Sequence, residues 1–520
     1  MTAGTYPDVR SGLQKLLKDG LLLFNYTGHG GTTALSDEKV LTQTDINQFT
    51  YTHLPVWVTA TCDFTRFDDL NTSAGEDVFL NKSSGGIALF TTVRVAYSRP
   101  NFPINDNVIR NLFERNNGRR RTLGEVMQAT KNTLSSVYKL GFCLIGDPAV
   151  KMAYPEFGMK VTTVNGQSVD GNSISFKALE KITVEGEVLD ASGQLVTDFT
   201  GIVNPTVKDS KVTVTCLKNS NKDDSPAFTF TDYPNTIFIG NDSVRNGKFS
   251  FTFTVPKDIS YSNLQGKMNL YAVDTESGNE AQGNFDNFIV GGTSDTAETD
   301  TIGPEIRALY LNDTTFVDGG QVNTTPYFVA ELWDKSGVNI TGSSVGHDMM
   351  LVIDESTVLS YNLNSYYELL LGEDGTGIVK FPIPALEPGK HTAEFWVWDI
   401  LNNSTVRTFT FEVVEGLKPF LFDVIATPGI AREQVTFHLM HNRPESRMRV
   451  GIMVYDLAGR QLWKHEESGT SGLFENYTVS WDLTSGGARM RPGVYIYRAA
   501  ISTDNSKDAT KARKFIILGE

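Results

Sequence analysis

The chain has 520 residues, of which 40% are hydrophobic and 21% are charged, as is typical of globular proteins. At this length we expect about three to five domains. The formal net charge of −15 argues against a nucleic-acid partner, because phosphate binding needs a basic surface. The chain has too few cysteines for a disulfide scaffold, since there are only three: Cys62, Cys143 and Cys216. No apolar run reaches the ~18 residues that a membrane-spanning helix needs.

Two short apolar runs near the amino end stop abruptly at polar turns. The run over residues 21–26 ends in the letters TGHGG, and the run over residues 55–60 ends in TCD. Such runs are typical of buried strands in a parallel sheet. In open α/β sheets the ligand site lies at the carboxyl ends of the strands. We therefore expect His29 and Cys62 to lie side by side at that edge.

These two residue types can act together as a base and a nucleophile. A free thiol has a pKa of about 8.5, and only the thiolate attacks. The His29 imidazole can take the proton from Cys62 and later return it to a leaving amine. Because a glycine backbone approaches a carbonyl closely, the N–H groups of Gly30 and Cys62 are candidate oxyanion donors. Two plainer interpretations stay open, since a cysteine at a strand end is often a small buried hydrophobe, and a Gly-His-Gly segment can be only a turn.

Helix and strand patterns alternate through the first 155 residues, which indicates an α/β sheet. Helices are predicted over residues 7–19, 37–49, 74–82, 105–115 and 122–138, and further strands over 86–93 and 142–145. Within the second of these helical stretches, Thr44-Asp45 is expected to open a separate short helix. Thr122 and Glu125 form a capping box that starts the last helix.

The other polar residues of this segment receive plainer interpretations. Arg66, Asp68 and Asp69 follow Cys62 and are expected to form a solvated loop. The run Arg119–Arg121 is predicted to be a solvated turn. Cys143 is predicted to belong to the core.

The segments around His29 and Cys62 carry a resemblance. A strand followed by GHG, then a strand followed by TAC 33 positions later, is similar to the gingipain-type cysteine peptidases, which have a caspase-like fold. More narrowly, NYTGHGG, VTATCDFTRFDD and GFCLIGDPAV look like the sortases of the type IX secretion system. The resemblance covers residues 1–155. It implies that His29 is the catalytic base and Cys62 the nucleophile, and by analogy of fold that residues 94–97 line the cleft.

The same resemblance implies a catalytic acid and pocket residues that residues 1–155 do not contain. In gingipains, an acidic residue that orients the histidine lies well upstream of it, as do parts of the substrate pocket. Residues 1–155 also offer too little sheet for a whole caspase-like fold. We therefore expect the chain to be the carboxyl-terminal part of a longer protein. On that expectation, the lack of a signal-peptide pattern in MTAGTYPDVRSGL carries no information about location.

After residue 155, short alternating runs separated by Asn, Asp, Gly and Ser clusters predict β-sandwiches. We predict three immunoglobulin-like all-β modules over residues 156–295, 303–415 and 416–520, with a polar linker at 291–305. The second module is expected to close with a hairpin that turns at Leu401–Ser404. The third resembles the carboxyl-terminal sorting domain of type IX cargo proteins.

The three modules show no ordered pattern of metal ligands. His347 and His391 are isolated in the sequence, which argues against a zinc site. Aspartates are frequent enough to bind calcium, but no single loop carries an ordered set of ligands. Cys216 is assigned no chemistry. We therefore predict neither a metal nor a cofactor.

By the resemblance, the chain is a cell-surface cysteine endopeptidase, or sortase, associated with the outer membrane. Its substrates would be secreted cargo proteins that bear carboxyl-terminal sorting domains. The acyl-enzyme would be resolved by water or by an amine of lipopolysaccharide. The partners so implied are this cargo, an outer-membrane β-barrel shuttle protein and anionic lipopolysaccharide.

Two other functions are consistent with the sequence. A surface adhesin or binding array with an inactive peptidase remnant fits the long β-rich part, although a remnant has no physical need of both GHGG and TATCD. An ordinary secreted endopeptidase that hydrolyses peptides freely fits the same histidine and cysteine. A carboxyl-terminal domain that persists after maturation would favour the sortase over that peptidase.

Overall fold

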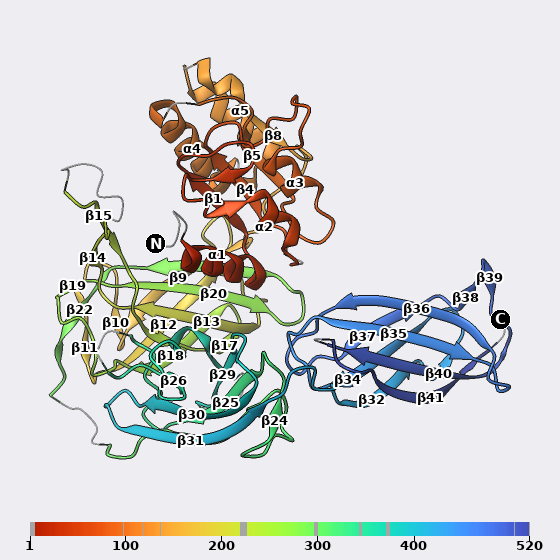
Figure 1. Cartoon of the computed structure of the whole chain (residues 1–520). Helices are drawn as coiled ribbons and strands as arrows, with labels where there is room; N and C mark the ends of the chain where they lie inside the picture. The colour runs from red at the N-terminus through yellow and green to blue at the C-terminus, as the bar shows by residue number, and fades with distance from the viewer. Residues whose placement is uncertain are drawn as a thin grey trace.

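The computed structural model describes residues 6–51, 53–96, 98–116, 118–135, 137–218, 226–295, 300–342, 346–370, 375–503 and 505–518. In Figure 1 an α/β unit, coloured red to orange, is followed along the chain by three β-rich units that end in blue. This layout confirms the predicted fold class of an α/β segment followed by all-β modules.

A four-stranded sheet forms the centre of the α/β unit. Its strands, in spatial order, are β1 (Leu23–Thr27), β4 (Val56–Ala60), β5 (Ala88–Thr92) and β8 (Phe142–Ile145). The first three run parallel, and β8 pairs antiparallel with β5 at the edge. Every residue of β4 and β5 is buried, which explains why both read as continuous apolar runs.

Helices cover both faces of this sheet. They are α1 (Pro7–Asp19), α2 (Gln43–Gln48), α3 (Ala74–Leu80), α4 (Ser98–Phe113) and α5 (Leu123–Thr133). The first three pack on one face, in a core that contains Trp57 and Leu89 of the central strands. The last two pack on the other face, with Val58 and Phe90. Smaller elements are β2 (Ala34–Leu35), β3 (Leu41–Thr42), β6 (Arg115–Asn116), β7 (Arg119–Arg120) and the 3-10 turn η1 (Val137–Gly141).

The predicted helix over residues 37–49 is wrong in its first half. That stretch forms a turn and strand β3 instead, and Lys39 has a positive φ of 53° that a helix does not allow. The short helix α2 does exist, and it starts after Thr42. The Thr42 side chain accepts a hydrogen bond from the Asp45 N–H, and the Asp45 carboxylate accepts one from the Thr42 N–H. This capping box fixes the start of the helix.

Two later helices also differ from their predicted bounds. Helix α4 begins at Ser98 rather than Asn105 and carries Pro103 inside it. The prediction started the helix after this proline because a proline removes a backbone donor from a helix interior, whereas in the structure the helix continues through it. Helix α5 ends at Thr133 instead of Tyr138, and η1 follows it. The predicted capping box of Thr122 is confirmed.

Arg119 and Arg120 of the predicted solvated turn form strand β7 instead; Arg119 is exposed, and all three arginine side chains have partners. In chain order, the guanidinium groups bond to the Glu125 carboxylate, the Tyr154 carbonyl oxygen and the Glu114 carboxylate. Of the three, Arg120 contacts the segment that leaves the α/β unit, where its guanidinium donates to the Met152 and Tyr154 carbonyl oxygens.

The second unit is built around one large sheet. Its strands are β9 (Phe157–Val164), β10 (Gln167–Ser168), β11 (Ile174–Ala178), β12 (Lys181–Leu189), β13 (Gly201–Lys208), β14 (Val212–Thr215), β15 (Thr229–Asp232), β16 (Thr236–Ile239), β17 (Asp242–Arg245), β18 (Lys248–Thr254), β19 (Leu264–Gln265), β20 (Lys267–Asp274), β21 (Glu280–Phe285) and β22 (Phe288–Thr293). Strand β21 pairs with β9 as well as β20, so the sheet closes on itself around its core. A second sheet of β11, β22 and β19 lies beside it, and β14 pairs with β15 in a separate ribbon.

The third unit has two sheets that share one core, as a sandwich does. Its elements are β23 (Glu305–Leu311), β24 (Gln321–Val322), β25 (Tyr327–Trp333), β26 (Met350–Ile353), β27 (Ser360–Asn362), η2 (Asn364–Tyr366), β28 (Tyr367–Leu369), β29 (Gly377–Pro382), β30 (Gly389–Trp398) and β31 (Ser404–Val413). The orders are β23-β25-β29-β28 and β24-β31-β30-β26-β27. The predicted closing hairpin is β30–β31, and Asn402 takes a positive φ of 73° in its turn.

The fourth unit repeats this layout around its own core. Its strands are β32 (Leu421–Thr427), β33 (Ile430–Ala431), β34 (Val435–His441), β35 (Met448–Tyr455), β36 (Gln461–Gly469), β37 (Tyr477–Trp481), β38 (Thr484–Ser485), β39 (Ala488–Arg489), β40 (Gly493–Ser502) and β41 (Ala509–Ile517). The two main sheets are β32-β34-β37 and β33-β41-β40-β35-β36. Among the described residues, no helix has both the length and the apolar character to span a membrane.

Candidate active site

Two neighbouring strands bring the predicted pair to one edge of the sheet. Thr27, the last residue of β1, pairs with Ala60, the last residue of β4. His29 and Cys62 each stand two positions beyond these partners, so their loops leave the sheet side by side. Cys62 is half-buried and His29 is exposed.

The glycine-rich loop is held by its own backbone and by a tyrosine. The Tyr26 hydroxyl donates to the His29 carbonyl oxygen at 2.6 Å, and the Ser36 N–H donates to the same oxygen at 2.8 Å. A Cβ added at Gly30 would collide with the Thr61 hydroxyl oxygen. Gly30 is therefore required where the loop meets the end of β4.

The cysteine loop is tied to the end of the next strand. The Asp63 N–H donates to the Arg94 carbonyl oxygen at 3.3 Å, and the Thr65 N–H donates to the Thr92 carbonyl oxygen at 3.1 Å. Asp63 itself has a positive φ of 48°, which turns the chain sharply after Cys62. These contacts fix the cysteine loop against the end of β5.

The thiol of Cys62 has one hydrogen-bond partner, the Ala96 carbonyl oxygen at 3.1 Å. In the described part of the chain, no hydrogen bond joins the His29 imidazole to Cys62 or to a carboxylate. The structure thus aligns the two loops but directs the thiol proton toward residue 96. Rotation of the Cys62 side chain about its Cα–Cβ bond would redirect the sulfur.

The two candidate oxyanion donors are unengaged. None of the hydrogen bonds found among the described residues uses the Gly30 N–H or the Cys62 N–H. Gly30 forms an antiparallel bridge with Leu35, but the bridge bonds come from the neighbouring Gly31 and Ser36 N–H groups. Both N–H groups at the site can therefore receive a developing negative charge.

A cavity of ≈ 200 Å³ opens next to Ala96, whose carbonyl oxygen accepts the hydrogen bond from the thiol. Its lining residues are Thr92, Arg94, Val95, Ala96, Val137 and Gly141. Residues 94–96 thus border the site as predicted by analogy of fold, and Tyr97 lies outside the described residues.

The loop after Cys62 contributes one fixed carboxylate near this cavity. Asp68 accepts two hydrogen bonds from the Arg94 guanidinium, at 3.0 and 2.6 Å. The Arg94 charge and these bonds lower the pKa of Asp68 below its usual value. Asp68 is exposed, as the predicted solvated loop requires, but it is paired. Of the other two cysteines, Cys143 is only half-buried in β8 and Cys216 is exposed.

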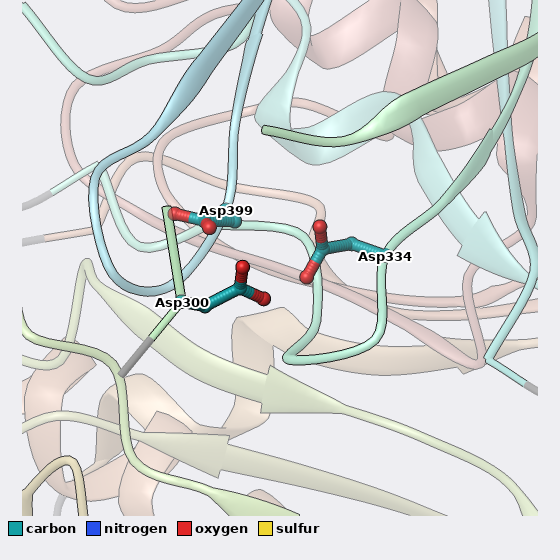
Figure 2. A group of neighbouring side chains, drawn as sticks. All are labelled: Asp300, Asp334 and Asp399. Atoms are coloured by element: carbon teal, nitrogen blue, oxygen red, sulfur yellow. The ribbon is translucent and has the colours of Figure 1, made fainter. Parts of the chain in front are cut away.

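Three aspartates form a separate acidic group in the third unit (Figure 2). One oxygen of each of Asp300, Asp334 and Asp399 lies within 4.8 Å of the other two, a spacing that could hold a cation. Burial raises the pKa of Asp334 to about 6, and burial also raises the pKa of Asp399. Sequence spacing gave no signal of this group, because its members come from three distant loops.

Both predicted isolated histidines of the third unit have carboxylate partners. His347 Nδ1 lies 2.7 Å from Asp258 Oδ2 of the second unit, and His391 Nδ1 lies 2.7 Å from Asp354 Oδ2. Among the described residues, neither histidine belongs to a group that could hold a metal. The first pair joins the third unit to the second.

The α/β unit that holds the two loops matches a known family. Residues 1–153 match the model of peptidase family C25. The matched residues span the α/β unit and include both strand-end loops. The predicted gingipain-type peptidase segment is thereby confirmed.

Three solved structures resemble the chain. The chain is similar to dimeric latent PorU from Porphyromonas gingivalis, at 34% identity and a TM-score of 0.35, over 99% of this chain and 47% of that chain. It is also similar to the Arg specific cysteine proteinase gingipain R, at 19% identity and a TM-score of 0.26, over 54% of this chain and 56% of that one. A complex of the pro- and mature domains of P. gingivalis RgpB matches at 20% identity and a TM-score of 0.26, over 54% and 57%.

The chain spans about half the length of the PorU chain that it matches. Among curated proteins, none matches it. The relation to the C25 peptidases therefore rests on the family match over residues 1–153.

Proposed function

We propose that this chain carries the nucleophile and base of a cell-surface cysteine endopeptidase that acts as a sortase. Its substrates are secreted proteins with a carboxyl-terminal sorting domain, and it cuts the peptide bond before that domain. The observation that carries the proposal is the strand register, which sets the loops of His29 and Cys62 beside each other in a segment of a peptidase family.

The chemistry follows from the groups at this edge. The His29 imidazole takes the thiol proton, and Cys62 Sγ attacks the substrate carbonyl carbon. The N–H groups of Gly30 and Cys62 hold the oxyanion. The C–N bond then breaks, and the His29 imidazolium gives its proton to the leaving amine. The thioester that remains is resolved by water or by a lipopolysaccharide amine.

In the structure, the thiol hydrogen bond to Ala96 has to be broken before His29 can accept the proton. The proposed outer-membrane location and β-barrel shuttle partner rest on the similarity to type IX sortases. The fourth unit is proposed to stay attached as a sorting-type domain.

Replacement of Cys62 by Ala in the producing cell tests the proposal. We expect cargo to keep its sorting domain, because loss of the nucleophile lowers the rate by roughly 10³-fold or more. The size of the cargo on a gel measures this. Cys143→Ala in the neighbouring edge strand is the matched control and should trim cargo normally.

Normal trimming by the Cys62→Ala protein would contradict the proposal. It would favour the adhesin with a peptidase remnant. A released fourth unit in the mature wild-type protein would instead favour an ordinary secreted endopeptidase.

A further inference from the structure

We propose that Tyr26 is a positioning residue for the catalytic histidine, and that its hydroxyl fixes the backbone of His29 so that the imidazole is presented to Cys62. This inference rests on the proposed function. It adds a residue that the proposed chemistry leaves out, since Tyr26 takes no part in the proton transfer or in the attack itself.

The loop that carries His29 is a small hairpin over residues 29–36. The Ser36 N–H donates to the His29 carbonyl oxygen at 2.8 Å, and Gly30 forms an antiparallel bridge with Leu35. The Leu35 side chain is fully buried in the core on the face of the sheet that α1, α2 and α3 cover. The returning side of the hairpin is therefore anchored in this core, whereas His29 stands on its outgoing side.

Two helix starts fix the tip of the hairpin. The Gln43 N–H of α2 donates to the Thr33 carbonyl oxygen at 2.9 Å, and the Ala74 N–H of α3 donates to the Thr32 carbonyl oxygen at 2.6 Å. The tip cannot shift without loss of these two bonds. Movement of the hairpin is thereby limited to its open end, where His29 follows strand β1.

Tyr26 holds that open end. Its hydroxyl donates to the His29 carbonyl oxygen at 2.6 Å, and because the Ser36 N–H donates to the same oxygen, both lone pairs of this carbonyl are used. A Cβ added at Gly28 would lie 2.8 Å from the Tyr26 hydroxyl oxygen, so the chain folds closely over the phenol. The Tyr26 ring packs against the same core that buries Leu35. The hydroxyl therefore ties the backbone of His29 to the packed face of the sheet.

The phenol of Tyr26 stays protonated, as a hydrogen-bond donor must. Burial raises the pKa of Tyr26 above its usual value. The Ser36 N–H opposes this shift, and the negative charges of Glu38 and Asp37 add to it. At neutral pH the Tyr26 hydroxyl can therefore donate to the His29 carbonyl oxygen throughout.

The position of the imidazole depends on this backbone anchor. In the described part of the chain, the His29 side chain is exposed and no hydrogen bond holds its ring. The direction of the ring is thus set by the backbone of His29, which Tyr26 and Ser36 fix. Because a misplacement of about 1 Å can cost about a hundredfold in rate, the anchor should affect catalysis.

Alkylation of Cys62 by iodoacetamide in the full chain tests this role. The Cys62 sulfur displaces iodide after His29 has taken the thiol proton, so the rate reports how well the two side chains are placed. Peptide mapping by mass spectrometry measures the rate at Cys62. With Tyr26→Phe, we expect this rate at neutral pH to fall by about fivefold to tenfold. The rate should also reach half its maximum at a higher pH, because the thiolate then forms with less help from the imidazole.

Tyr51→Phe is the matched control. The Tyr51 hydroxyl also donates to a backbone carbonyl oxygen, that of Gly85 at 2.8 Å, and its ring lies in the same core. Each variant thus loses one tyrosine hydrogen bond, but only Tyr26→Phe should slow the alkylation of Cys62. A 4-aminophenylalanine at position 26 keeps a donor in place of the hydroxyl and should restore most of the rate. Circular dichroism of each variant checks that the fold is retained.

The same substitution in a His29→Gln background separates positioning from a general loss of structure. If Tyr26 acts through His29, Tyr26→Phe should change the rate by less than about twofold once the imidazole is gone. A full effect in that background, an unchanged rate in Tyr26→Phe alone, or an equal loss in Tyr51→Phe would overturn the role of Tyr26 and leave the proposed peptidase pair standing. A rate at Cys62 that His29→Gln leaves unchanged would overturn both proposals.

Discussion

Reactive side chains gather at two places in this molecule, and the two places treat their polar groups differently. At the edge of the α/β sheet, the Gly30 and Cys62 N–H groups have no partners among the described residues, and His29 is exposed. In the third unit, the carboxylates of Asp334 and Asp399 are buried and accept backbone N–H bonds from their own loops.

The reason lies in how each place is built. The sheet edge sets short loops beside one another, and their backbone groups point away from the ladder with nothing to bond. The aspartate loops turn back on themselves, so each carboxylate is used to fix its own turn. Groups left unpaired can act on a substrate, whereas groups bonded within their own turns mainly set local structure and proton affinity.

The largest effect that sharpens this comparison is expected at His29. His29→Gln should lower the rate of cargo cleavage by about 10²–10⁴-fold, because the base for the Cys62 thiol is lost. Quantitative gel analysis of cargo processing measures the change. His53→Gln is the matched control, since His53 is also exposed but packs beside Gly20 before the sheet. A similar loss with both variants would remove His29 from the proposed mechanism.

A smaller loss is expected at the contact between the two loops. In Gly30→Ala, the new Cβ would collide with the Thr61 hydroxyl oxygen and displace the oxyanion donor. We expect cleavage to fall by about 10²-fold, as misplacement by about 1 Å does in other enzymes. Gly31→Ala is the control, because a Cβ there meets no atom within 4 Å.

The double variant Gly30→Ala/Thr61→Ala distinguishes a collision from a simple need for glycine. Thr61→Ala removes the hydroxyl that the new Cβ meets, so part of the lost rate should return. If the double variant is no faster than Gly30→Ala, the close contact between the loops is not what limits the site.

The smallest effect concerns stability and belongs to the aspartate group. The pKa of Asp334 is about 6 in the folded chain against 3.8 as the ordinary value, so the folded state holds a proton more tightly. Protonated Asp334 therefore stabilises the folded state fully below about pH 4, and this stabilisation is lost as the pH rises through about 6. The free energy of unfolding of the third unit should fall by up to about 3 kcal/mol over this range.

Hydrogen exchange of the β25 and β29 amides, corrected for intrinsic rates, measures this change. Asp334→Asn should flatten the pH dependence, because the amide does not titrate. Asp354→Asn is a control on the same unit, where the carboxylate pairs with His391 at the surface. An equally steep profile in Asp334→Asn would assign the dependence to another group.

Much of the α/β unit could be predicted from sequence because its signals are local. A central strand buried on both faces must be largely apolar, and the run before TCD has that character. The run before TGHGG forms β1, which is only partly buried. The capping box at Thr122 was equally visible, since it needs only residues three positions apart. The start of α4 was not, because Pro103 argues against a helix interior, yet α4 continues through it.

By itself, the sequence determined which residues could act as nucleophile, base and oxyanion donor, because these roles depend on residue type and on position at a strand end. Tertiary structure decided which of their neighbours are paired. The Cys62 thiol is bonded to the Ala96 carbonyl, and the Thr92 hydroxyl is left without a partner. Hydrogen bonds and cavities join residues far apart in the chain, so no local pattern specifies them.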